Sequence, residues 1–256
     1  SVAGITGPKN PVINTRPFRS PHHTVSPAAM TGGTANPRPG EMSLAHNGVL
    51  FLDELPEFHR DTLEALRQPL EEGTVSVSRA MYTVTFPSRF MLVCAMNPCK
   101  CGWYGQPGRK CTCTERSVRN YQSRISGPLL DRIDMIIEVP ALNFEALSSR
   151  ADAEPSAEIR KRVNSARNIQ RRRFGKNSTE RNAQMGPQEL KEHCALDKSG
   201  RDIMELAYSK MGLTARSYDR ILRVARTIAD LAGEEKISPH HLAEAIQYRT
   251  YDFQNS

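Results

Sequence analysis

The segment Gly48–Glu54 constrains the fold of this chain more than any other part of the sequence. Four bulky apolar residues, Val49–Leu52, run directly into Asp53 and Glu54. An uninterrupted apolar run of this length is typical of a strand that is buried on both faces, as in a parallel sheet covered by helices. Ligands of open α/β sheets bind beyond the carboxyl ends of the strands. The segment therefore predicts an α/β core with an acidic site, although a strand that merely ends in two solvated acids fits the same residues.

The adjacent acids suit phosphate chemistry. One carboxylate can hold Mg²⁺ while its neighbour polarises a water for attack on a terminal phosphate. Successive side chains of a strand point in opposite directions, so Asp53 and Glu54 can divide these two tasks.

Composition limits the class of protein and its partners. The chain has 256 residues and a formal net charge of +7, which favours polyanionic partners such as nucleotides or DNA. A soluble protein that is merely basic fits the charge equally well. No apolar run reaches the roughly 18 residues that a membrane span needs, and the first ten residues lack the pattern of a signal peptide. We therefore expect a cytoplasmic protein with no membrane partner.

Hydrophobic spacing and helix breakers predict the order of elements. The first 47 residues are rich in Pro, Gly, Ser, Thr and Asn, which predicts irregular structure with one short strand near Arg16–His22. From Glu154-Pro155 onward the apolar spacing is helical throughout, so we expect an α/β domain over residues 1–152 and an all-helical domain over residues 153–256. Between these regions the pattern predicts helix Phe58–Glu72, hairpin Thr74–Phe86, buried strand Phe90–Met96, helix Glu115–Ile125 and strand Met135–Val139.

Four of the six cysteines lie within fifteen residues. They form the pattern C-x-C-x₉-C-x-C, with Cys99, Cys101, Cys111 and Cys113 on a loop rich in glycine. Four thiolates can form a closed tetrahedral zinc site, although the one-residue spacing is tighter than the usual two-residue spacing. We expect a structural Zn²⁺ here, with four free thiols on an exposed loop as the alternative.

Longer strings resemble a known family. They are RPFRSPHH at residues 16–23, PRPGEMSLAHNGVLFLDELP at 37–56, SGPLLDRID at 126–134 and TARSYDRILRVARTIADL at 214–231. They resemble the magnesium-chelatase-like branch of the AAA+ ATPases, and within it the competence-related ComM/YifB type. The resemblance implies an α/β AAA+ core with a parallel sheet, followed by an all-helical lid domain.

One expected part of such an ATPase is missing from the sequence. The phosphate-binding loop, Gly-x-x-x-x-Gly-Lys-Ser/Thr, does not occur, and the family places it upstream of residues 16–23. We therefore expect this chain to be a C-terminal piece of a longer protein, without the N-terminal strand and the phosphate-binding loop of the core. These residues alone are expected neither to bind nor to hydrolyse ATP appreciably.

The resemblance assigns roles to individual residues. Asp53 would hold Mg²⁺, Glu54 would be the general base and Asn97 would orient the attacking water. Arg132 would reach the nucleotide of a neighbouring subunit, with an intrachain pair to Asp131 or Asp134 as the alternative, and Asn97 could instead be a turn residue before Pro98. Further cations that the resemblance places at the nucleotide or the subunit interface are Arg216, Arg220 and Arg124.

The resemblance also implies a function for the full-length protein. It would be an ATP- and Mg²⁺-dependent motor that forms a hexameric ring and acts on DNA as a helicase or translocase, with branch migration as its role. Arg79, at the tip of the hairpin, would contact DNA phosphates, and an ordinary solvated hairpin is the alternative. Two other functions fit the sequence: a metal-insertion motor subunit of the magnesium chelatase type, and a non-enzymatic zinc-stabilised module that binds nucleic acid.

Overall fold

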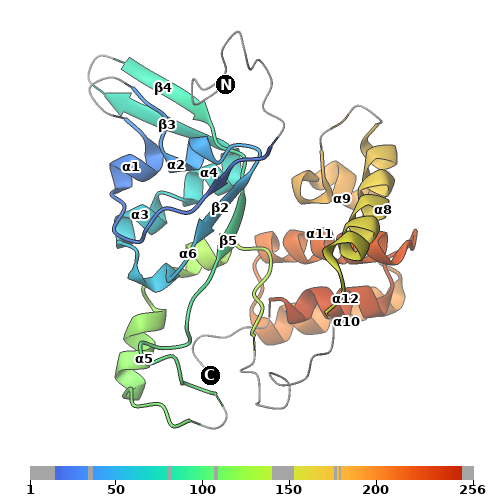
Figure 1. The fold of residues 1–256 in the computed structure, drawn as a ribbon. Helices are drawn as coiled ribbons and strands as arrows, with labels where there is room; N and C mark the ends of the chain where they lie inside the picture. Colours follow the sequence, from blue (N-terminus) through green and yellow to red (C-terminus); the bar gives the residue numbers. More distant parts are fainter. Residues whose placement is uncertain are drawn as a thin grey trace. The chain divides into compact units, whose positions relative to one another are not determined.

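The computed structural model describes residues 15–33, 37–79, 82–106, 109–139, 153–175, 178 and 180–249. These residues form two compact units, which we call unit 1 and unit 2, and the division falls between Ile133 and Asp134. Unit 1 is an α/β unit with a parallel sheet and unit 2 is helical (Figure 1). This confirms the predicted fold class. The predicted domain boundary at 152/153 stays a prediction, because residues 140–152 lie outside the described ranges.

Unit 1 combines short strands with short helices. Its elements in chain order are β1 (Phe18–Arg19), α1 (Pro27–Thr31), α2 (Glu41–Leu44), β2 (Val49–Leu52), the 3₁₀ turn η1 (Leu55–Glu57), α3 (Arg60–Glu64), α4 (Arg67–Glu72), β3 (Thr74–Arg79), β4 (Tyr82–Pro87), β5 (Met91–Cys94), α5 (Glu115–Gln122) and α6 (Gly127–Leu130).

The sheet that positions the site has the order β1-β2-β5, and both pairings are parallel. β2 is therefore the middle strand, as the apolar run at 49–52 predicts. Leu50 and Leu52 are fully buried in a core that also contains Met30, Met42 and Leu66. Gly48 is required where β2 begins, because a Cβ atom there would lie 1.9 Å from the carbonyl oxygen of Pro17. The missing side chain lets β1 approach closely enough to pair.

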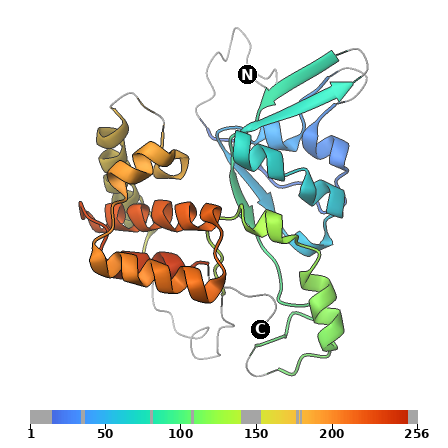
Figure 2. The same ribbon diagram turned by 180° about the vertical axis from the view of Figure 1, so that it is seen from behind.

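The predicted hairpin is also present. β3 and β4 pair antiparallel from Thr74↔Pro87 to Arg79↔Tyr82. Val75 and Val77 face the core, and the opposite face carries cross-strand hydroxyl pairs such as Ser76–Thr85. Both views of unit 1 place the hairpin at one end and α5 at the other (Figures 1 and 2).

Three sequence-based predictions of elements were wrong in detail. The helix expected over 58–72 is divided into α3 and α4, because Pro69 cannot donate a hydrogen bond to the carbonyl of Ala65 and its ring crowds that group. The strand expected to be buried over 90–96 is the shorter β5, an edge strand of this three-stranded sheet on which Met91 is 64% exposed. Residues 135–139 are not assigned as a strand, and apolar alternation without a neighbouring strand does not make a sheet.

Unit 2 is built from helices with well-formed ends. Its elements are α8 (Ser156–Phe174), the 3₁₀ turn η2 (Asn182–Gln184), α9 (Pro187–His193), α10 (Lys198–Met211), α11 (Ala215–Ala232) and α12 (Pro239–Gln247). Thr214 caps α11 by accepting a hydrogen bond from the backbone N–H of Ser217 at 3.2 Å. Gly233, with φ of 76°, ends α11 in the left-handed conformation that glycine adopts without strain.

A buried charge cluster ties three of these elements together. Asp230 on α11 accepts hydrogen bonds from Arg173 on α8, from Asn182 on η2 and from Arg226 one turn away. Burial alone would raise the pKa of Asp230, but the hydrogen bonds from Arg173 and Asn182 and the two guanidinium charges outweigh it, and the pKa is lowered. Asp230 is therefore held ionised in the interior of the lid.

Within the described residues, no helix combines the length and the apolar character that crossing a membrane requires.

Candidate functional site

The two acids lie at the carboxyl end of the middle strand. Asp53 is exposed, and its Oδ1 accepts a hydrogen bond from the backbone N–H of Glu54 at 2.9 Å. Glu54 has φ of 52° and ψ of 46°, a left-handed conformation that is uncommon for residues other than glycine. Such strained residues cluster at functional sites. The turn directs the chain into η1 and leaves both carboxylates accessible at the edge of the sheet.

A histidine from the neighbouring strand contacts the second acid. His23 follows β1, and its Nδ1 lies 3.1 Å from Oε2 of Glu54. The imidazole also packs edge-on against Phe58 and beside His22, with ring centroids 6.4 Å and 4.1 Å away. These contacts fix the position of His23, so it can hold the Glu54 carboxylate in one orientation.

Asn97 follows the third strand at the same edge. The backbones of β2 and β5 remain paired beyond the strands, since Ala95 donates to Leu52 and accepts from Leu55. Asn97 comes two residues later and is exposed. The parallel sheet therefore brings the ends of β1, β2 and β5 together, and with them His23, Asp53-Glu54 and Asn97.

The two arginines that the sequence places near this site have different surroundings. Arg132 is buried, with its side chain 6% exposed; its Nη2 lies 2.7 Å from Oε2 of Glu71, and its Nη1 donates to the carbonyl of Pro128. Glu71 is therefore an intrachain partner of Arg132, and the expected pair with Asp131 or Asp134 stays a prediction. Arg124 is exposed and donates from Nη1 to the carbonyl of Pro56 and to Glu57, both at 3.0 Å.

The remaining arginines lie elsewhere. In unit 2, Arg216 is exposed in the first turn of α11, and Arg220 one turn later forms an ion pair with Asp134 at 2.5 Å. Arg79 ends β3, but its side chain and the hairpin tip lie outside the described residues. The roles given to these three residues stay predictions.

The four clustered cysteines converge. The Sγ atoms of Cys99, Cys101, Cys111 and Cys113 all lie within 4.8 Å of one another. Three of the separations are 3.3, 3.4 and 3.7 Å, close to the about 3.8 Å edge of a tetrahedron with Zn–S bonds of about 2.3 Å. The loop is anchored to α5, since Gln122 donates to the carbonyl of Pro98 at 3.0 Å. The donor set, its number and its spacing fit a structural zinc ion.

The thiols have opposite tendencies to ionise. Backbone N–H groups of Trp103 and Thr112 lower the pKa of Cys101 to about 5. Burial, with a further contribution from the neighbouring sulfurs, raises the pKa of Cys111 to about 12. The protein groups thus favour one thiolate and disfavour a second, and a bound dication is the partner that would stabilise all four.

Comparisons with known proteins agree with this arrangement. The family model for the magnesium chelatase ChlI subunit matches residues 1–147, and the model for its C-terminal part matches residues 153–249. This chain belongs to the magnesium chelatase ChlI family.

The chain is similar to proteins of the ComM/YifB type and, more distantly, to DNA replication licensing factors. Competence protein ComM of Haemophilus influenzae is 49% identical over 235 residues, 91% of this chain and 45% of that protein. YifB of Salmonella typhimurium is 46% identical over 93% of this chain and 46% of its own length. The DNA replication licensing factor mcm6 of Xenopus tropicalis is 25% identical over 81% of this chain and 25% of its length. The chain spans about half the length of the ComM and YifB relatives, and the resemblance to the ComM/YifB type is confirmed.

The sequence reading of this ChlI-family site missed two contacts. His23 received no role, although a short strand before it and a parallel sheet together place it at the edge that carries Glu54. Glu71 was not recognised as the partner of Arg132, because the two are 61 positions apart and only the folded packing of α4 near α6 brings them together.

Proposed function

We propose that this chain supplies the hydrolytic acids and the helical lid of a ring-forming AAA+ ATPase of the ComM type. In this proposal the full-length protein couples ATP hydrolysis to movement along DNA and to branch migration. The observation that carries it is the placement of Asp53 and Glu54 at the carboxyl end of the middle strand of a parallel sheet. Membership of the ChlI family supports an AAA+-type protein, and the distant similarity to licensing factors supports a ring and a DNA partner.

The residues at the sheet edge suit the steps of phosphate hydrolysis. Carboxylate oxygen is a ligand that Mg²⁺ prefers, and Asp53 is exposed and would hold the ion. When bound, Mg²⁺ would neutralise charge on the phosphate oxygens. Glu54 would accept the proton of the attacking water, His23 would orient Glu54, and Asn97 would position the water. Arg132, Arg216 and Arg220 would stabilise phosphate charge, which for Arg132 requires that it leave Glu71.

We also propose that the cysteine cluster binds one structural Zn²⁺. Four sulfur ligands close the coordination sphere and leave no position for a substrate. The ion would fix the loop between β5 and α5, which begins directly after Asn97. Its role would therefore be to hold the end of β5 and the start of α5 in place.

Specific observations also support two other functions. The match to the magnesium chelatase ChlI model favours a metal-insertion motor that acts on a partner protein. The basic composition and the cysteine cluster favour a non-enzymatic module that binds nucleic acid. The ComM relative and the licensing-factor similarity favour the DNA motor over both.

A fork-unwinding assay on the full-length gene product separates the three functions. We expect ATP-dependent unwinding of forked DNA that is lost in Glu54→Gln and kept in Glu72→Gln, a matched loss of an exposed carboxylate at the end of α4. ATP hydrolysis that DNA neither stimulates nor needs, without unwinding, would favour the metal-insertion motor. DNA binding without any hydrolysis would favour the non-enzymatic module.

A further inference from the structure

The cysteine loop and α5 carry a concentration of positive charge that the hydrolytic site does not use. Between positions 99 and 124 the only acidic residue is Glu115. We call the six cations of this segment the α5 basic surface: Lys100, Arg109, Lys110, Arg116, Arg119 and Arg124. Even after the negative charge of a zinc–thiolate group is counted, the segment stays net positive.

Several of these cations are not neutralised by the protein. Among the described residues, Lys100, Lys110 and Arg116 take part in no ion pair, whereas Arg119 pairs with Glu115 and Arg124 with Glu57. The other basic segment, α8, is mixed. Its cations Lys161, Arg162 and Arg173 are each paired with an acid, whereas Arg160, Arg171 and Arg172 are exposed. The α5 basic surface is the better candidate because three of its cations, Lys100, Arg116 and Arg124, line one pocket that contains no carboxylate.

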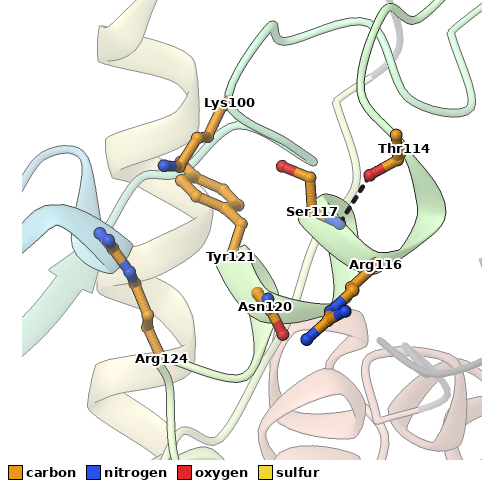
Figure 3. Close-up of a pocket in the computed structure, with 7 residues that line it drawn as sticks. All are labelled: Lys100, Thr114, Arg116, Ser117, Asn120, Tyr121 and Arg124. Atoms are coloured by element: carbon orange, nitrogen blue, oxygen red, sulfur yellow. Dashed lines mark hydrogen bonds between the residues drawn. The ribbon is translucent and has the colours of Figure 1, made fainter.

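The surface contains a pocket of about 400 Å³ beside α5 (Figure 3). Its lining combines the cations Lys100, Arg116 and Arg124 with the polar side chains of Thr114, Ser117 and Asn120, and it contains no carboxylate. Ammonium, guanidinium, hydroxyl and amide groups are the donors that bind phosphate oxygens in nucleic-acid complexes. The chemistry of the lining therefore fits a phosphate group.

The cysteine cluster keeps the cations of the loop close together. Lys100 lies between Cys99 and Cys101, and Lys110 precedes Cys111, whose sulfur lies 3.7 Å from that of Cys99. The same loop carries an aromatic ring, since the guanidinium carbon of Arg109 lies 4.7 Å above the centre of the Trp103 ring. Cations that follow a backbone together with an aromatic ring are the usual means of binding single strands.

We infer that the α5 basic surface, with Trp103, binds the phosphate backbone of single-stranded nucleic acid. The inference deepens the proposed function, on which it rests, by adding a strand contact on the α5 basic surface to the one proposed for Arg79. The pocket beside α5 takes one phosphate, Lys110 and Arg109 bind its neighbours, and the Trp103 ring stacks on an unpaired base.

The test compares two charge-matched variants of the full-length gene product. One carries Lys100→Ala, Lys110→Ala and Arg116→Ala; the control carries Arg160→Ala, Arg171→Ala and Arg172→Ala on the exposed face of α8. Binding of a fluorescent oligo-dT is measured by anisotropy over a range of salt concentrations, without nucleotide. We expect the first variant to bind at least about tenfold more weakly, with a salt slope lower by about 2, since each phosphate contact in a single strand contributes about 0.7. The control should bind like the wild type.

A third variant tests the stacking contact. Trp103→Ala should weaken binding about fivefold or more without changing the salt slope, because stacking is not an ionic contact. Zinc content and the melting temperature confirm that each variant is folded. If the triple variant loses its zinc, the single variant Arg116→Glu tests the inference in its place. Arg116 lies on the exposed side of α5, outside the metal-ligand segments.

Defined results would overturn the inference. They are wild-type binding in the folded α5 variant, an equal loss in the α8 control, or no binding of oligo-dT by the wild-type protein. Complete displacement of the oligonucleotide by millimolar inorganic phosphate would also overturn it, since it would indicate a site for a free anion. ATP hydrolysis is measured in parallel without DNA. If the proposed function fails, the wild-type protein shows no hydrolysis. If only this inference fails, the wild-type protein hydrolyses ATP and the α5 variant binds the strand as the wild type does.

Discussion

Arg132 and Glu71 form an ion pair in unit 1, with 2.7 Å between Nη2 of the buried guanidinium and Oε2 of the more exposed carboxylate. The pair joins the segment after α6 to the end of α4, and it holds in place the guanidinium to which the family resemblance gives a role in the neighbouring subunit. A stable pair within the chain and a contact across a subunit interface exclude each other at any one moment. Variants of the two partners therefore distinguish a structural arginine from a catalytic one.

We expect Arg132→Ala in the full-length protein to keep nucleotide binding and to lose turnover by about 10³-fold, the loss typical of arginine fingers. Glu71→Ala should keep turnover, because it removes only the partner in the resting subunit. Steady-state ATPase rates and nucleotide titrations check both. If the two variants lose turnover and melting temperature in parallel, the pair is structural and Arg132 is not the finger.

The contact between His23 and Glu54 leads to a second prediction. Without the imidazole, Glu54 would sample several orientations, and a hydrogen bond to a charged group contributes about 1.5–3 kcal/mol. We expect His23→Ala to lower kcat by about tenfold with little change in nucleotide affinity. His59→Ala is the matched control, since the side chain of His59 is 71% exposed and lies beside Asp61, and it should keep the rate. A similar fall in both variants would argue against a positioning role for His23.

Metal analysis tests the cysteine cluster. The 256-residue chain, purified without chelator, should contain one zinc ion. Cys111→Ser should lose it, because three thiolates bind zinc less tightly than four, whereas Cys94→Ser should keep it, since Cys94 lies on β5 outside the cluster. Elemental analysis by mass spectrometry measures the content. Zinc-free wild-type protein, or zinc retained by the serine variant at position 111, would count against the site.

The buried charge cluster of the lid predicts a pH dependence of stability. Asp230→Asn leaves two buried guanidinium groups without their carboxylate and should lower the free energy of unfolding by about 3 kcal/mol. The pKa of Asp230 is lowered in the folded state. The wild type should therefore exceed Asp230→Asn in free energy of unfolding by the full amount above pH about 4, the pKa of Asp in the unfolded chain. This difference should shrink as the pH falls below that pKa.

Urea unfolding followed by far-ultraviolet circular dichroism, which reports mainly on the helices of unit 2, measures this effect between pH 7 and pH 3. Asp202→Asn, on the exposed side of α10, should change the free energy by less than about 0.5 kcal/mol. A difference between the wild type and Asp230→Asn that stays constant down to pH 3 would show that the charge of Asp230 is not the cause.

Local sequence signals account for the parts of the fold that one strand or one turn decides. The apolar run 49–52 identified the middle strand, and the alternation around 74–86 identified the hairpin, because each pattern reflects burial of its own side chains. The predictions of elements failed where a single residue, or a partner distant in the sequence, determines the local structure. Pro69 divides a helix whose apolar periodicity is otherwise continuous. Residues 135–139 have the alternation of a strand, but no strand within the described part of the chain pairs with them.

The candidate site shows the same limit. Asp53, Glu54 and Asn97 could be placed at one edge because parallel strands end on the same side. The contact of His23 with Glu54 depends on the order of strands in the sheet, and that of Arg132 with Glu71 depends on the packing of helices. Neither is encoded by spacing along the chain.

The close approach of the four sulfur atoms also affects how the protein must be handled. With Sγ atoms as near as 3.3 Å and a disulfide bond length of about 2.05 Å, a small movement of the metal-free loop would allow an oxidant to link two of them. Such a bond would draw the loop into a new shape directly beside Asn97 and at the start of α5. If the proposed zinc is lost in air, the loop would therefore be trapped in a disulfide-bonded form, and reduction before zinc is added back would be needed to restore the cluster.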